Sequence, residues 1–302
     1  MKDLYRIKEE FLAHGFTVVE NAIRLGELEP LKSLIEKEIN DRAQAFYSTR
    51  ELDELFESEP LQLRLLRLGE RCPRLRQGWK PNLNLSREIY ELMTHDSVKE
   101  ILMTILSAEA FTDASPQLRI QNPSSTQETT AWHQDTSYAN DALKKEGVVA
   151  DKIQFVTCWI PLMDVDVQNG CLNVMPGSKN WGLVKSSRDA ENHIRAQIDV
   201  EARGCPVPVP MKQGDILFMH NLCLHCGNLN VSDRLRWSVD FRYFPAADSE
   251  RLDAEQKRIL DVMSHLGEKD RRPTFRGVSR SGRQSSYEEW IDRSRSLEAS
   301  DS

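Results

Sequence analysis

Short β-rich runs separated by turn signals fill the segment from Leu118 to Tyr243 and limit the possible folds more than any other feature. The runs at 154–160 and 216–219 combine apolar side chains with β-branched or aromatic ones, as strands do. The run Arg236–Tyr243 alternates polar and apolar side chains, which is typical of a strand with one face in the core. Because turn signals rich in Gly, Pro and Asn recur between these runs, we expect a mainly β fold, a sandwich or a barrel.

The first third of the chain carries helical patterns instead. Phe11 and Leu12 are expected on the apolar face of a first helix, and the run at 16–19 predicts a short strand. Apolar residues then recur at helical spacing over 25–39 and 97–106, and the segment 51–68, acidic and then rich in Leu, is expected to be helical with a loop. We interpret these helices as a scaffold around the β segment.

The end of the chain is charged and polar. An amphipathic helix is predicted over 252–266, and the segment from Lys269 to Arg283 is basic. Such a run could bind an anionic substrate or partner, although a solvated loop is the commoner outcome. We expect a single domain over 1–302, with a helical part at about 1–110, a β core at about 111–246 and this tail at about 247–302.

Composition narrows the class of protein. The chain has 302 residues, a net charge of −7 and 29% charged residues, which suits a soluble fold with a sizeable core. No apolar run approaches the ~20 residues that a membrane helix needs. The opening Met1–Arg6 lacks the apolar segment of a secretory signal, so we expect a cytoplasmic protein. The acidic balance argues against a general nucleic-acid binder, and nothing indicates the oligomeric state.

The six cysteines are expected to be reduced and mostly buried. Two of them, Cys223 and Cys226, form a single CxxC motif, which is a weak zinc signal without a second pair. A structural zinc site built from His220, Cys223, His225 and Cys226 is one alternative. Strand geometry argues against it, because side chains so close in sequence would alternate between the two faces.

A histidine and a carboxylate two positions apart, His133 and Asp135, are the strongest chemical signal. On an extended strand these side chains lie on one face, so a ring nitrogen and a carboxylate oxygen can converge on one metal ion. Alone the pair is common, and a hydrogen-bonded pair is the ordinary alternative. Here a turn-rich β segment follows, with His220 and His225 near its end. Two histidines and one carboxylate form the facial triad of non-heme Fe(II) oxygenases, which leaves positions open for a cosubstrate and O₂.

An arginine at the start of the next predicted strand adds to this pattern. Guanidinium binds a carboxylate through two parallel hydrogen bonds, as an enzyme that uses 2-oxoglutarate requires for the C5 carboxylate. Arg234 and Arg236 both qualify, and alternation places them on one face.

The order of these motifs resembles the phytanoyl-CoA dioxygenase-like family of Fe(II)/2-oxoglutarate-dependent oxygenases. The resemblance extends from Phe11 to about Tyr243 and does not cover the tail. It implies a double-stranded β-helix, which is a jelly-roll relative of the cupins, with helices packed outside. Its most specific parts are 132–135, 159–161, 169–172, 176–178 and 214–236.

The resemblance also implies roles for single residues. The iron ligands would be His133, Asp135 and His225, because His220 matches an earlier histidine of the family pattern. Arg236, which fits that pattern better than Arg234, would bind the C5 carboxylate of 2-oxoglutarate. Trp159 would pack on this cosubstrate, and Gln117 matches a cosubstrate-binding glutamine of the ectoine hydroxylase relatives. One departure is that Cys226-Gly227 stands where the family often has Gly-Ser, whose hydroxyl reaches the cosubstrate.

The implied activity is hydroxylation of an unactivated C–H bond in a small-molecule substrate, with O₂ consumed and succinate and CO₂ released. Halogenating members of the family lack the carboxylate, so the presence of Asp135 favours hydroxylation or another oxidation. Tyr138 could line the substrate side or belong to the core. The alternative function is that of a cupin-like metal- or ligand-binding protein without oxygenase activity.

Overall fold

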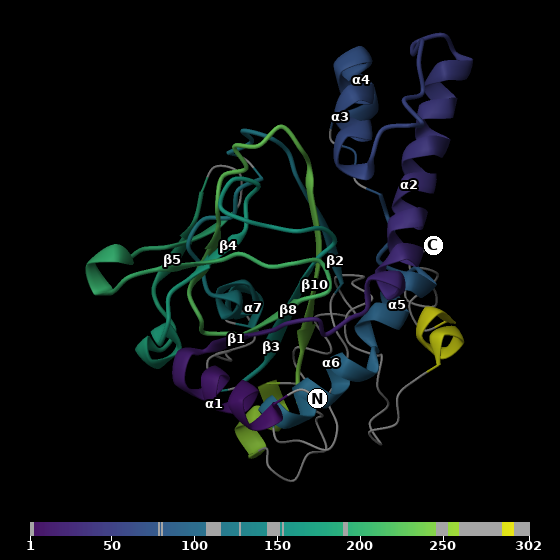
Figure 1. Ribbon diagram of the computed structural model, residues 1–302. Helices are drawn as coiled ribbons and strands as arrows, with labels where there is room; N and C mark the ends of the chain where they lie inside the picture. Colours follow the sequence, from purple (N-terminus) through teal and green to yellow (C-terminus); the bar gives the residue numbers. More distant parts are fainter. Residues whose placement is uncertain are drawn as a thin grey trace.

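Two antiparallel sheets form the centre of the molecule in a computed structural model of the chain (Figure 1). The described residues are 3–77, 79, 81–106, 116–126, 128–143, 152, 154–189, 193–245, 253–259 and 286–292. The larger sheet has the strand order β1 (Phe16–Val19), β8 (Ile216–His220), β3 (Val156–Pro161), β10 (Arg236–Tyr243) and β2 (Gln117–Gln121). The smaller sheet has the order β7 (Val207–Val209), β4 (Leu172–Val174) and β9 (His225–Gly227). A separate pair joins β5 (Ser186–Arg188) to β6 (Ile194–Ala196).

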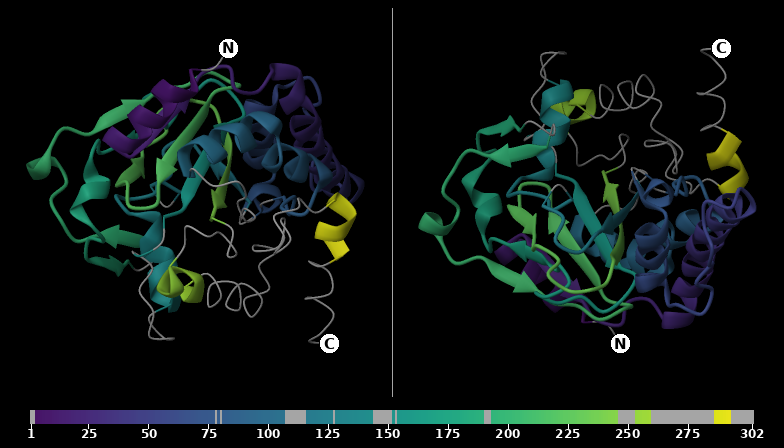
Figure 2. Two further views of the ribbon diagram at one scale, coloured as in Figure 1. Left: turned by 90° about the horizontal axis from the view of Figure 1, so that it is seen from below. Right: turned by 90° about the horizontal axis from the view of Figure 1, so that it is seen from above.

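The helices of the first third of the chain lie to one side of the larger sheet, as the views from below and above show (Figure 2). They are α1 (Leu4–His14), α2 (Leu25–Ser48), α3 (Leu61–Arg71), α4 (Pro73–Arg76), α5 (Arg87–Met93) and α6 (Asp96–Leu106). The helices predicted over 25–39 and 97–106 are confirmed, and α2 continues beyond its predicted end. In the segment 51–68 the helix begins only at Leu61, because turns and irregular chain occupy the acidic part before it.

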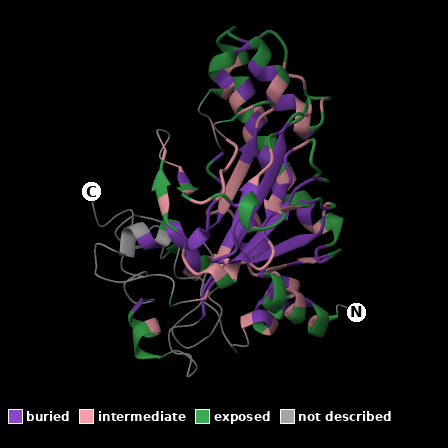
Figure 3. Cartoon of the chain, turned by 90° about the vertical axis from the view of Figure 1, so that its left-hand side faces the viewer, coloured by how far each residue is buried: buried purple, intermediate pink, exposed green. Residues whose placement is uncertain are grey.

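The alternation in β10 decides which side of the larger sheet packs against the helices. Trp237, Val239, Phe241 and Tyr243 are almost fully buried in the same apolar cluster as the helices, and the Tyr243 hydroxyl donates to the Met93 carbonyl of α5. Buried residues accordingly concentrate in the strands, while exposed residues lie on the outward helix faces (Figure 3). The opposite face of β10 is polar, and it contributes to the site described below.

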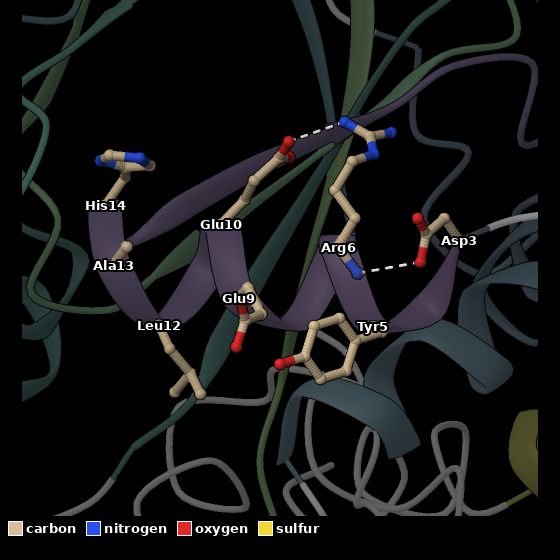
Figure 4. Close-up of a pocket in the computed structure, with 8 residues that line it drawn as sticks. All are labelled: Asp3, Tyr5, Arg6, Glu9, Glu10, Leu12, Ala13 and His14. Atoms are coloured by element: carbon tan, nitrogen blue, oxygen red, sulfur yellow. Dashed lines mark hydrogen bonds and ion pairs between the residues drawn. The ribbon is translucent and has the colours of Figure 1, made fainter.

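The outer face of α1 corrects one prediction. Phe11 is buried, as expected, but Leu12 is 51% exposed because the next position around the helix turns away from the sheet. Leu12 and Tyr5 instead line a shallow hollow built from α1 alone (Figure 4). In this hollow Arg6 pairs with Glu10, and nothing there resembles a metal or cofactor site.

The tail is described only in part. Residues 254–259 are helical, in agreement with the first half of the helix predicted over 252–266, and the second half lies outside the described residues. The basic segment from Lys269 to Arg283 lies outside them as well. A short helical piece within 286–292 packs near α5, where the Tyr287 hydroxyl donates to the Leu85 carbonyl. Among the described residues, no helix is both long and apolar enough to cross a membrane.

Candidate metal centre

His133 and His225 are held side by side by their own backbones. The His133 amide donates to the His225 carbonyl at 3.0 Å, and the His225 amide donates to the His133 carbonyl at 3.1 Å. His225 begins β9, whose other edge pairs with β4, so His133 extends the smaller sheet by one bridge. The two ring centroids lie 4.2 Å apart as a result.

Asp135 completes the cluster from a helix rather than from a strand. It is the first residue of α7 (Asp135–Leu143), so the prediction that His133 and Asp135 share one extended strand is wrong. The chain leaves the bridge at His133 and turns into the helix within two residues, which brings the carboxylate back toward the imidazoles. One ligand atom from each of His133, Asp135 and His225 lies within 4.8 Å of the others, and all three residues are buried. Within the part of the chain that the structure describes, this is the one cluster able to hold a metal ion.

Hydrogen bonds fix which nitrogen of each imidazole faces the cluster. The Nδ1 atom of His133 lies 2.8 Å from the Ala131 carbonyl, and that of His225 lies 3.0 Å from the Cys223 carbonyl. A carbonyl only accepts, so each Nδ1 carries a proton, and each Nε2 is the nitrogen left to face a metal. Burial, together with the neighbouring His133, lowers the pKa of His225 to about 4, which keeps this ring neutral at neutral pH.

The Asp135 carboxylate is held at both of its oxygens. The Thr157 hydroxyl of β3 donates to Oδ2, and Nη2 of Arg242 lies 3.2 Å from Oδ1. Burial opposes ionisation of this carboxyl, but the Arg242 charge and the two imidazoles outweigh it and hold its pKa well below the usual range. One carboxylate and two imidazole nitrogens are the donor set that Fe(II) takes in facial-triad sites, so the residues present fit that metal.

Gln134, which lies between His133 and Asp135 in the sequence, joins the surrounding loops by hydrogen bonds. Gln134 is fully buried, and its Nε2 donates to the carbonyls of Gly182 and Leu222, both at 2.8 Å. Its Oε1 accepts from the Val184 amide at 2.8 Å. Every polar atom of this side chain is therefore used to join three chain segments around the cluster.

Arg236, the predicted carboxylate clamp, is buried at the start of β10 and has neutral partners. Gln121 Oε1 accepts from Nε at 3.1 Å and from Nη2 at 2.5 Å, and Ser238 Oγ accepts from Nη1 at 2.7 Å. The guanidinium carbon lies 5.5 Å from the centre of the Trp159 ring. Burial, reinforced by the charge of Arg119, lowers the pKa of Arg236 to about 10, so it stays protonated.

No carboxylate among the described residues forms an ion pair with Arg236. A buried cation of this kind is costly unless a counter-ion joins it, which makes the position suitable for the carboxylate of a bound molecule. The side chain of Arg234 is 65% exposed and pairs with Asp233, so it does not compete for this role. The hydroxyl that contacts Arg236 is that of Ser238, on the same face of β10. Cys226 and Gly227, which follow His225, carry no hydroxyl.

The other residues that the sequence singled out lie at different places in the structure. Gln117 begins β2 opposite Asp240 of β10 and is half-buried. His220 lies on the opposite face of the larger sheet, where its ring centroid is 6.0 Å from that of Phe11. Cys223 and Cys226 are buried free thiols and form no metal-binding group with His220 and His225 among the described residues. The rings of Tyr138, from α7, and His133 meet edge to face, with their centroids 5.5 Å apart.

Sequence reasoning missed several polar neighbours of the cluster. They are Thr157, Arg242, Asp240, Arg119 and Gln121. The available signal was the alternation in β10, which puts Arg236, Ser238, Asp240 and Arg242 on one face. Four consecutive polar positions on one side of an otherwise buried strand indicate a polar interior, because a strand packed in an apolar core does not carry them.

Similar solved structures define the class of fold. The non-heme monooxygenase ThoJ in its apo form superposes with a TM-score of 0.54 at 17% identity, over 80% of this chain and 77% of that chain. The epimerase SnoN in complex with Fe3+, alpha ketoglutarate and nogalamycin RO gives a TM-score of 0.52 at 17% identity, over 81% and 84%. At this identity the likeness concerns the fold alone, and it confirms the predicted double-stranded β-helix with helices outside.

The sequence itself gives the family. The sequence model of phytanoyl-CoA dioxygenase matches residues 11–238, which is most of the chain. The chain therefore belongs to the phytanoyl-CoA dioxygenase family, as the motifs predicted. A relative in Bos taurus, phytanoyl-CoA dioxygenase domain-containing protein 1, is 28% identical over 96 residues, or 30% of this chain and 33% of the relative. The chain spans about a third of the length of the curated relatives it matches.

Proposed function

We propose that this chain is an Fe(II)/2-oxoglutarate-dependent dioxygenase that hydroxylates an unactivated C–H bond of a small molecule. The observation that carries the proposal is the pairing of two features in one interior. A buried His–Asp–His cluster presents two ring nitrogens and a carboxylate, and a buried arginine, which pairs with no carboxylate among the described residues, lies on the same face of β10 as Arg242, the partner of Asp135. Membership of the phytanoyl-CoA dioxygenase family supports this combination, and so does the Fe3+ and alpha ketoglutarate bound by the structural neighbour SnoN.

Each residue then has a defined task. His133, Asp135 and His225 would hold Fe(II), and Arg236 would bind the C5 carboxylate of 2-oxoglutarate. Trp159 would pack beside the cosubstrate, and Gln117, the first residue of β2, would bind it. Bound iron would activate O₂, and the four electrons for its reduction would come in equal shares from 2-oxoglutarate and the C–H bond of the substrate, with succinate, CO₂ and the alcohol as products. The chain itself supplies orientation and a site closed to water, since all three ligands are buried.

An anaerobic titration of Fe(II) and 2-oxoglutarate into the metal-free protein tests this proposal. A visible metal-to-ligand charge-transfer band is expected in the wild type, absent in His133→Ala and weak in Arg236→Ala. A folded wild-type protein that binds the metal but gives no band with 2-oxoglutarate would instead favour the cupin-like binding protein.

The type of oxidation needs a second measurement, because the neighbour SnoN is named an epimerase. Once a substrate is found, turnover under ¹⁸O₂ separates the outcomes. Hydroxylation places one labelled oxygen atom in the product, and the other labelled atom goes to succinate. Epimerisation leaves the product unlabelled. The proposed hydroxylation requires a labelled product; Asp135 argues only against halogenation, so this label decides between hydroxylation and epimerisation.

A further inference from the structure

A chain of alternating charges leads from the Asp135 carboxylate along the polar face of the larger sheet. Arg242 places Nη2 3.2 Å from Asp135 Oδ1, and its Nη1 donates to Asp240 Oδ1. Arg119 of β2 donates from Nε to Asp240 Oδ2 and lies 3.4 Å from Oδ1 through Nη2. The side chains of Asp135 and Asp240 are 2% and 3% exposed, so both carboxylates depend on these partners.

Strand register explains why this chain of charges is well ordered. Arg242 lies directly opposite Thr157 in the β10–β3 pair, and both side chains reach Asp135. Two neighbouring strands thus supply one donor each to the two oxygens of a single carboxylate. Side chains that project from paired strands are fixed more firmly than side chains on loops.

The two donors leave Asp135 one orientation. Thr157 occupies Oδ2, while Oδ1 lies 3.6 Å from His133 Nε2, on the side of the imidazoles. An aspartate without such partners can rotate about its terminal bond and exchange its oxygens. Arg242 opposes that rotation, because its second nitrogen is tied to Asp240.

We propose that Arg242 is a positioning residue that holds Oδ1 of Asp135 toward the two imidazole nitrogens, with Asp240 holding Arg242 in turn. This inference rests on the proposed function, in which His133, Asp135 and His225 bind the metal. Arg242 does not touch the reacting atoms in this scheme. It acts on the affinity and geometry of the metal site through the orientation of one ligand.

The test compares one substitution at two positions, Arg242→Lys and Arg67→Lys. Lysine keeps the charge, but its compact ammonium lacks the planar fork that places one Nη atom of Arg242 at Asp135 and the other at Asp240. Arg67 is the matched control, because it forms an exposed pair with Glu70 on α3 at 3.1 Å. Co(II) titrated into the metal-free proteins reports affinity, and its visible absorption bands report coordination geometry.

We expect Arg242→Lys to weaken Co(II) binding about 10- to 100-fold and to change the Co(II) spectrum, while Arg67→Lys stays within about twofold of the wild type. A purely structural role would lower the melting temperature of Arg242→Lys and leave the affinity and spectrum of the folded protein unchanged, which would overturn the inference. If the wild type binds no Co(II), the proposed function and this inference both fail. If the wild type binds and Arg242→Lys binds equally well, only the inference fails.

A second variant covers the case in which Arg242→Lys does not fold. Asp240→Asn keeps the contact between Arg242 and Asp135 but removes the charge that anchors Arg242 from the other side. We expect it to weaken Co(II) binding about threefold to tenfold in a folded protein, a part of the effect typical of residues that orient metal ligands. Unchanged Co(II) affinity in folded Asp240→Asn would refute the positioning role.

Discussion

His133 and His225 exchange both of their backbone hydrogen bonds, at 3.0 and 3.1 Å, although they are 92 positions apart in sequence. The bridge depends on main-chain atoms alone, so it survives the loss of either ring. We therefore expect His133→Ala to fold, with a loss of about 1–2 kcal/mol in the free energy of unfolding, and to lose stoichiometric Fe(II). Metal analysis after anaerobic loading, with circular dichroism of the same sample, measures both effects.

His193→Ala is the control for this substitution, because His193 lies just before β6 and its side chain is 42% exposed. It should bind Fe(II) like the wild type. Iron bound at wild-type affinity by His133→Ala would show that the metal site has been placed wrongly.

Arg236 gives a prediction that separates cosubstrate binding from metal binding. Arg236→Met should raise the dissociation constant of 2-oxoglutarate roughly 100-fold, about 2.7 kcal/mol, because a buried charged hydrogen bond is lost. The affinity for Fe(II) should change by less than about twofold, since Arg236 bonds Gln121 and Ser238 and none of the three ligands. Calorimetric titration of both ligands tests this. Arg234→Met, at an exposed position, should alter neither constant.

The sequence predicted four of the five strands of the larger sheet, all but β2, and predicted the path of the chain at the site less well. Arg236–Tyr243 was predicted with its observed limits, because strict alternation is a local property. The helix that begins at Asp135 was missed, since its residues show no apolar stripe at helical spacing and are fixed by contacts with distant segments.

The choice between His220 and His225 as the third ligand depended on strand register. His220 and His225 are both plausible from spacing, but His220 pairs with Val156 on the face that points to α1, while His225 bridges to His133. The partners of Asp135 could not be predicted for the same reason. Thr157 and Arg242 meet only because β3 and β10 are adjacent, and the order of strands in a sheet is not a local feature of the sequence.

Gln134 gives a prediction about stability. Gln134→Leu removes the partners of three backbone groups, those of Gly182, Val184 and Leu222, inside a fully buried site. Each of the three orphaned groups costs about 1–3 kcal/mol, so we expect a total loss of about 3–9 kcal/mol in a urea unfolding curve. Gln213→Leu is the control, because the Gln213 Nε2 is buried without a hydrogen-bond partner among the described residues, and this substitution should cost less than about 1 kcal/mol. Equal losses in the two variants would contradict the role assigned to Gln134.

His220 gives a prediction about pH. Burial, with a smaller effect of Lys179, lowers the pKa of His220 to about 4, against an ordinary value of 6.5. Between these values the unfolded chain binds a proton at this ring and the folded chain does not. The contribution of His220 to the free energy of unfolding should therefore fall by about 1.4 kcal/mol per pH unit on acidification from pH 6.5 toward pH 4.

The variant His220→Asn isolates this effect. An asparagine oxygen can accept from the Leu222 amide, as His220 Nδ1 does at 3.0 Å, but it does not titrate. His225 titrates in both metal-free proteins, so its contribution to the pH dependence of the free energy of unfolding is the same in both and drops out of the difference. Urea unfolding at pH 7, 6 and 5 should give a shallower acid slope for His220→Asn, with the two proteins differing by a constant amount above pH 6.5. Parallel curves across the whole range would mean that the folded protein protonates His220 as readily as the unfolded chain does.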